Sequence, residues 1–304
     1  MEIKRIGILR GGIGNNHAIS VRKGGDIISH IFENLSDKYK VVDIFIDKNG
    51  NWHANGLPIM PADLVRKVDV VWNTSKHSGL SAVLNDLSVS SVGNSSFLKS
   101  LENNREILEA YIKSIGIKMP RSIVLPLYQK DFDGPENRYA IKKAKEVFEK
   151  FSAPWVVKSF TPDSSMGIHL AKTFGELAEA IEDGVNHNKS ILIEEFITGK
   201  PSTVHSISGF RGEDIYVLPP QNFSTDEKEK IVVFAKDLHK HLATKHYLKS
   251  DFILHPKRGF FLTSIESSPD LRQGSHFEQS CQYIGAEMHH ILEHILEKAL
   301  NKKI

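Results

Sequence analysis

The chain has 304 residues, of which 40% are hydrophobic, and its 39 basic residues nearly balance its 37 acidic ones to give a formal net charge of +2. This length suits one large domain or two to three smaller ones with a sizeable core, and the balanced charge gives no reason to expect nucleic acid or a membrane as a partner. Cys281 is the only cysteine, so no intrachain disulfide forms, and we expect it to pack in the core. The charged first residues do not resemble a secretory signal and no apolar run is long enough to span a bilayer, so we expect a cytoplasmic protein.

Strands and helices alternate over residues 1–95, which predicts a mainly parallel α/β sheet. The glycine-rich turn at 11–16, between the first strand and the first helix, indicates a nucleotide or anion site at a helix N-terminus. A dinucleotide fingerprint needs its last glycine where His17 stands, so a dehydrogenase that uses Asp43 or Asp47 is a weaker alternative. The expected elements are strands over 3–10, 39–47, 68–73 and 89–92 and helices over 19–32 and 80–87.

The rest of the chain contains an α+β pattern in which a strand, a serine-rich loop, a strand, a helix and a strand follow one another. Thr173 and Glu176 have the spacing of a capping box that opens the helix of this pattern. The expected helices cover 95–115, 139–151, 174–183, 227–243 and 285–301, and the expected strands cover 154–160, 168–171, 190–193, 204–210 and 214–219. In the last helix, apolar residues at helical spacing predict a core face: Met288, Ile291, Leu292, Ile295, Leu296 and Leu300.

A hairpin is predicted over residues 250–268, with apolar strands at 252–254 and 260–262 and a turn at 256–259. Asp251 and Glu266 stand at its outer ends. If His255 pairs with Phe260, Asp251 pairs with Ser264, and the two carboxylates point to the same face as diagonal neighbours. Two such carboxylates repel each other unless a cation lies between them, which favours a metal site. The alternative is that both simply end strands at the protein surface.

With these elements in order, the chain resembles ATP-grasp enzymes, specifically the D-alanine–D-alanine ligase family. The resemblance implies an α/β and α+β ATP-grasp fold of three domains, with ATP between the last two and a possible homodimer through the first. The expected domains are an N-terminal parallel-sheet (pre-ATP-grasp) domain over 1–95, a central domain over 96–196 and a C-terminal domain with the metal site over 197–304. The segments that carry the resemblance are Gly11-Gly12, 41–52, 156–168, 191–204, 250–254 and 265–269.

The resemblance also implies roles for particular residues. Lys158 corresponds to a lysine that contacts the ATP phosphates, and Lys249 or Arg272 would orient the substrate carboxylate. The loop that closes over the phosphates corresponds to Ser164, Ser165, Met166 and Gly167. The hinge that receives adenine corresponds to Glu194, Glu195, Phe196 and Ile197. The ligands of Mg²⁺ (or Mn²⁺) correspond to Asp251, Glu266 and Ser268.

Several positions depart from the family pattern. Ser268 replaces an asparagine and is a weaker oxygen donor, Pro201 replaces the acid that holds the ribose, and Lys249 replaces an arginine and loses its bidentate fork. Asn16 replaces the glutamate that holds the first amino group, and the loop that covers the acceptor is shortened to 219–223. The nucleotide half of the pattern is better kept than the alanine half.

Two functional hypotheses follow from the resemblance. The first is an ATP-dependent ligase that joins a small-molecule carboxylate to an amine, with amino acids as substrates, through an acyl phosphate and with release of ADP and phosphate. The second is a degenerate relative that binds nucleotide or a partner without ligation. His77 and His276 are further candidates to line the acceptor pocket.

Overall fold

The structure is a computed structural model that describes residues 3–14, 16–75, 78–93, 95–160 and 166–301. The chain divides into two compact units. Unit 1 contains Met1–Leu108, Ser202–Asp251 and Ser264–Ile304, and unit 2 contains Glu109–Pro201 and Phe252–Thr263. The predicted three-domain boundaries near residues 95 and 196 remain a prediction. No helix within the described residues is long and apolar enough to cross a membrane.

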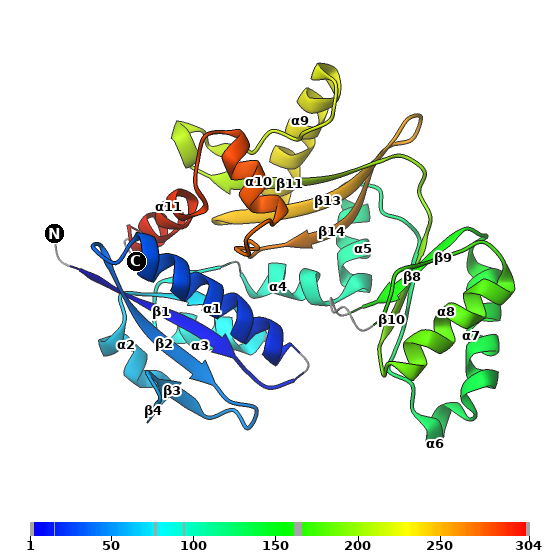
Figure 1. The fold of residues 1–304 in the computed structure, drawn as a ribbon, viewed down its shortest axis with the longest axis horizontal. Helices are drawn as coiled ribbons and strands as arrows, with labels where there is room; N and C mark the ends of the chain where they lie inside the picture. Colours follow the sequence, from blue (N-terminus) through cyan, green and yellow to red (C-terminus); the bar gives the residue numbers. More distant parts are fainter. Residues whose placement is uncertain (1–2, 15, 76–77, 94, 161–165, 302–304) are drawn as a thin grey trace. The chain divides into compact units, whose positions relative to one another are not determined.

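Unit 1 begins with a six-stranded sheet of order β4-β3-β2-β1-β5-β6 (Figure 1). The strands β2, β1, β5 and β6 run parallel, as the alternating sequence pattern predicts. The antiparallel hairpin β3–β4, which adds to the edge at β2, was not predicted. The elements are β1 Lys4–Gly11, α1 His17–Asn34, β2 Tyr39–Ile46, β3 Trp52–Ala54, β4 Leu57–Ile59, η1 Pro61–Asp63, α2 Leu64–Lys67, β5 Val70–Asn73, α3 Ser78–Asp86 and β6 Ser91–Val92.

Strand β1 is central because apolar side chains on both of its faces are buried, which is typical of a parallel strand covered on both sides. Ile6 and Ile8 pack with α1, whereas Leu9 packs in a second cluster on the opposite side. The strand ends at Gly11, whose φ is +86°, and a Cβ there would lie 2.2 Å from the carbonyl oxygen of Ile46. A glycine is therefore required where the chain turns from β1 toward α1.

Two helices, α4 Ser96–Asn103 and α5 Arg105–Ser114, stand where the sequence predicts a single helix over 95–115. The prediction is wrong at Asn104, where the backbone is extended (φ −131°, ψ 108°). The side-chain oxygen of Asn104 accepts a hydrogen bond of 3.0 Å from the backbone N–H of Ile107 and so caps the second helix.

A four-stranded sheet of order β12-β11-β13-β14 contains the predicted hairpin. Its strands are β11 Lys200–Ser208, β12 Ile215–Val217, β13 Tyr247–His255 and β14 Gly259–Glu266, and the elements around it are η2 Phe210–Gly212, α9 Thr225–His241, α10 His276–Tyr283 and α11 Met288–Leu300. The short helix α10 was not predicted. The apolar face of α11 is buried as predicted, with Leu300 packed at the edge of the same cluster as β1 and α1. One core therefore joins the N-terminal sheet to the C-terminal helices of unit 1.

Unit 2 is built on a second four-stranded sheet, of order β7-β10-β8-β9, whose strands all pair antiparallel. Helices α7 and α8 lie side by side against this sheet (Figure 1). At the start of α8, Thr173 caps Glu176 N as predicted, but the Glu176 carboxylate accepts from Lys172 N, so the box is only half formed. The elements are β7 Ser122–Leu125, α6 Lys130–Asp133, α7 Glu136–Lys150, β8 Trp155–Ser159, β9 His169–Ala171, α8 Phe174–Asn186 and β10 Ile191–Glu195.

Candidate functional site

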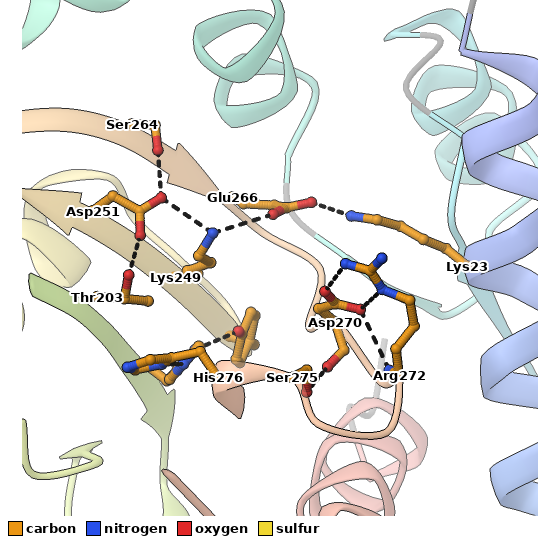
Figure 2. Close-up of polar contacts among 12 residues, drawn as sticks. Lys23, Thr203, Lys249, Asp251, Ser264, Glu266, Asp270, Arg272, Ser275 and His276 are labelled. Carbon is orange, nitrogen blue, oxygen red and sulfur yellow. Dashed lines mark hydrogen bonds and ion pairs between the residues drawn. The ribbon is translucent and has the colours of Figure 1, made fainter. Parts of the chain in front are cut away.

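Two carboxylates and a lysine, all in unit 1, meet on one face of the β13–β14 hairpin, as Figure 2 shows. Lys249 and Asp251 lie two residues apart on β13, so strand alternation points both side chains the same way. The Lys249 Nζ is 3.1 Å from Asp251 Oδ2 and 3.9 Å from Glu266 Oε2. The prediction that Asp251 and Glu266 face the same side is therefore confirmed. The cation that lies within 4 Å of both carboxylates is the Lys249 ammonium.

Hydroxyl groups from the neighbouring strands hold Asp251 in place. The Thr203 hydroxyl on β11 donates to Asp251 Oδ1 at 2.6 Å, and the Ser264 hydroxyl on β14 donates to Oδ2, also at 2.6 Å. Each oxygen of the carboxylate thus accepts one charge-assisted hydrogen bond, which is among the stronger kinds. The aspartate is oriented before any ligand arrives.

A second lysine, Lys23 of α1, forms an ion pair with Glu266 Oε1 (Figure 2). Burial alone would lower the pKa of Lys249, but the charges of Asp251 and Glu266 outweigh this effect and raise the pKa above its ordinary value. Lys249 therefore stays protonated, and two ammonium groups balance two carboxylates in this site.

These oxygen donors fit a divalent cation of the magnesium type. The described residues contain no cluster of three or more His, Cys, Asp or Glu side chains that would form a cage built from protein ligands alone. Magnesium usually binds through one or two carboxylates and completes its coordination with waters and substrate phosphates, which matches Asp251 and Glu266. The Ser268 hydroxyl oxygen, two residues after Glu266 in the chain, is buried and has no hydrogen-bond partner among the described residues.

The predicted nucleotide residues lie in unit 2, where Lys158 and Glu194 form an ion pair. Lys158 stands on β8 and Glu194 on the adjacent β10, and their nitrogen and oxygen atoms are 2.6 Å apart. Glu194 is almost fully buried, whereas the Lys158 side chain is about one third exposed. The Glu194 carboxylate therefore binds the Lys158 ammonium directly, and the lysine side chain remains partly open to solvent.

The other three residues of the predicted adenine hinge differ in their contacts and in their exposure. Glu195 accepts from Arg121 Nε at 2.9 Å and lies 3.5 Å from Arg258 Nη1. Burial alone would raise the pKa of Glu195, but these two arginines outweigh it and lower the pKa. Ile197 is buried, and Phe196 is 40% exposed with its backbone N–H bonded to Pro154. Only Phe196 thus presents an aromatic surface to a ligand.

The predicted phosphate loop is described only at its end. Ser164 and Ser165 lie outside the described residues. The Met166 side chain is buried in the core of unit 2, and Gly167 is exposed. Met166 therefore anchors the described end of the loop in this core, and any direct contact of Met166 with a ligand would come from its backbone.

Arg272 does not meet the other predicted catalytic residue, Lys249, in a direct contact. Its guanidinium instead binds Asp270 two residues away, with Nε at 2.8 Å from Oδ1 and Nη2 at 2.5 Å from Oδ2 (Figure 2).

Cys281 is buried as predicted, and burial raises the pKa of its thiol to about 12. It therefore does not provide a nucleophile.

Sequence reasoning missed Lys23 and Thr203, which come from elements far from the hairpin in the chain. Lys23 is 243 residues from Glu266 and Thr203 is 48 residues from Asp251. Thr203 is partly buried and precedes the buried run of β11, which indicates a strand position but not the carboxylate it meets. No local pattern distinguishes Lys23, whose side chain is only 14% exposed, from the other lysines of the sequence.

Comparison with known proteins gives a consistent result over the whole chain. The family model described as D-ala D-ala ligase C-terminus matches residues 112–210. The D-alanine–D-alanine ligase of Christiangramia forsetii is 22% identical over 99% of both chains. Over its whole length the chain is thus similar, as a distant relative, to the D-alanine–D-alanine ligases. The predicted resemblance is confirmed.

Solved structures of this family show the same fold. The D-alanyl-alanine synthetase A of Vibrio cholerae superposes with a TM-score of 0.76 at 17% identity and full coverage of both chains. The Bacillus anthracis D-alanine–D-alanine ligase, solved in complex with ATP, gives a TM-score of 0.69 at 19% identity, covering 98% of this chain and 97% of that chain. The predicted ATP-grasp fold, with its α/β and α+β parts, is confirmed.

Proposed function

We propose that the protein is an ATP-dependent carboxylate–amine ligase. The observation that carries this proposal is the convergence of Asp251, Glu266 and Lys249 on one face of a hairpin, in a chain that matches ligases from end to end. In the proposed reaction a substrate carboxylate takes the γ-phosphoryl group of ATP, which gives an acyl phosphate and ADP. An amine then attacks the acyl carbon, a C–N bond forms, and phosphate leaves.

The chain's own residues act by positioning and charge, which supply most of the catalysis in phosphoryl transfer. Lys249 would orient the substrate carboxylate, because its ammonium remains protonated between Asp251 and Glu266. Lys158 and the exposed face of Phe196 would bind ATP. Asp251 and Glu266, with the Ser268 hydroxyl, would hold Mg²⁺ or Mn²⁺. When bound, such an ion supplies positive charge to the phosphate oxygens.

The substrates we propose are small carboxylates and amines of the amino acid class, since the relatives are named as D-alanine ligases. A homodimer and a cytoplasmic location belong to the same proposal. The second candidate is a protein that binds nucleotide without ligation. The ion pair between Lys23 and Glu266 favours it, because a metal ion must compete with this ammonium for the carboxylate.

ADP release measured with a panel of D- and L-amino acids separates these functions. We expect Asp251→Asn and Glu266→Gln to lower turnover on the order of 10²–10³-fold, as losses of transition-state electrostatics do. Glu229→Gln, which changes an exposed carboxylate on α9, should turn over like the wild type. Melting temperatures show whether each variant is folded.

Turnover at the wild-type rate in both site variants would remove the metal assignment. Thermal stabilisation by Mg-ATP without ADP release for any pairing of acid and amine would favour the binding protein instead.

A further inference from the structure

A chain of three hydrogen-bonded rings lies next to the carboxylate site in unit 1. The Tyr247 hydroxyl on β13 is 2.7 Å from His205 Nδ1 on β11, and His205 Nε2 is 2.9 Å from His276 Nδ1 at the start of α10. The ring of Phe277 packs edge-on against both His205 and Tyr247. The contacts run from the core of the unit to its surface.

The inner two rings are closed to solvent. His205 is 2% exposed and Tyr247 is 1% exposed. Burial lowers the pKa of His205 well below its ordinary value, and His276 and Lys249 lower it further. Burial likewise raises the pKa of Tyr247. His205 therefore stays neutral, and Tyr247 keeps its proton, over the pH range in which enzymes work.

The outer ring, His276, is exposed and anchored on one side only. Its Nδ1 contacts His205 and lies 3.3 Å from the Ser280 hydroxyl, whereas its Nε2 forms no hydrogen bond with the described part of the chain. This ring is held firmly and presents one nitrogen to solvent.

Charged groups from the hairpin act on His276. Burial lowers its pKa, Asp251 raises it and Lys249 lowers it, and the net direction is downward. The ring is therefore neutral at pH 7 and able to accept a proton. His205, which faces it from β11, carries no charge.

We propose that His276 is the general base that deprotonates the incoming amine, and that His205 and Tyr247 are positioning residues. In this step the substrate ammonium gives one proton to His276 Nε2, and the neutral amine nitrogen forms the C–N bond. The C–O bond to phosphate breaks, and the departing phosphate takes the second proton from the nitrogen. The His276 imidazolium then returns its proton to water. The inference rests on the proposed ligase function.

The proposed step requires one direction of donation along the three rings. For Nε2 to accept, the proton of neutral His276 must sit on Nδ1 and be donated to His205 Nε2. His205 then carries its proton on Nδ1 and donates it to the Tyr247 oxygen. Because burial keeps His205 uncharged, the proton taken from the amine stays on His276, where solvent can remove it.

The experiment compares two acceptors in the same enzyme. D-alanine, or whichever amino acid of the panel supports ADP release, arrives as an ammonium and needs a base. Hydroxylamine is largely unprotonated at neutral pH and traps the acyl phosphate without one. We expect His276→Gln to lower the ratio of amino-acid product to hydroxamate 10²–10³-fold, which is the usual contribution of a general base. His290→Gln, an exposed histidine on α11, should leave the ratio unchanged.

The positioning residues are tested with a substitution that keeps the packing. Tyr247→Phe removes only the hydroxyl that binds His205 and should lower the same ratio about 10-fold. Tyr39→Phe is the matched control, since Tyr39 is also a buried tyrosine of this core. Melting temperatures establish that both variants are folded.

One result would overturn the inference alone: a ratio of amino-acid product to hydroxamate that His276→Gln leaves unchanged, whether both products fall equally or neither falls. Wild-type protein that releases no ADP with any amino acid, with or without hydroxylamine, would overturn the proposed function and the role of His276 together.

Discussion

Mild acid should destabilise unit 1 through His239 of α9. The ring is 2% exposed and lies between two hydroxyl groups, with Nδ1 at 2.7 Å from Ser206 Oγ and Nε2 at 2.8 Å from Ser208 Oγ. Burial lowers the pKa of His239 from 6.5 to about 4. Between these values the unfolded chain binds a proton that the folded protein does not, so stability falls as the pH falls.

The size of the effect follows from the two pKa values. A full shift from 6.5 to about 4 corresponds to roughly 3.4 kcal/mol at 1.36 kcal/mol per unit. At pH 5.0 the linkage relation gives about 2 kcal/mol of this loss, relative to pH 7.5. Two kcal/mol is a large share of the stability of an ordinary domain.

Urea unfolding followed by circular dichroism at pH 7.5 and 5.0 measures this loss. Between pH 7.5 and 5.0 the wild type should lose about 2 kcal/mol more of its free energy of unfolding than His239→Gln loses. His290→Gln serves as the exposed control and should keep the wild-type dependence. If the two pH dependences of the wild type and His239→Gln agree within about 0.5 kcal/mol, the assignment of acid sensitivity to His239 is refuted.

Two further predictions concern buried groups of unit 1. Lys99 is buried, donates to Ser75 O at 2.9 Å, and has a pKa lowered by burial to about 8, so Lys99→Met should stabilise the protein by about 1–2 kcal/mol at pH 7. It should also remove the rise in wild-type stability between pH 8 and 10, and a rise that persists in the variant would contradict the reasoning. In α1, a Cβ at Gly24 would lie 2.7 Å from Arg10 Cβ, whereas one at Gly25 meets nothing within 4 Å. Gly24→Ala should therefore destabilise by about 1–3 kcal/mol and Gly25→Ala should stabilise by about 0.5–1 kcal/mol, and equal urea midpoints for the two variants would show that the contact is not limiting.

Much of the fold was predictable because the patterns are local. The parallel strands of the first sheet, the hairpin of β13 and β14, and the buried face of α11 all follow from periodicity over a few residues. The break at Asn104 and the short helix α10 were missed. An Asn inside a helical pattern is tolerated in some helices and caps others, so only packing decides which occurs.

The candidate site was predictable where one strand or hairpin supplies the residues. Asp251 and Glu266 were found because alternation places both on one face. The residues that pair with these carboxylates from other elements were not predicted. Lys23 of α1 forms an ion pair with Glu266, and Thr203 of β11 donates to Asp251. The His205–His276 contact likewise joins residues 71 positions apart.

The amino-acid sequence by itself determined the order of elements, the family resemblance and the face on which the two carboxylates lie, because these depend on spacing along a strand. Only the tertiary structure decided that Lys249 and Lys23 neutralise those carboxylates and that a buried histidine aligns an exposed one. Such contacts depend on which distant elements pack together. The spacing of residues along one strand or helix does not indicate which side chains of other elements will lie beside them. The physical reason is that burial and charge, which set the pKa of Lys249 and of His276, are properties of the folded surroundings of a residue.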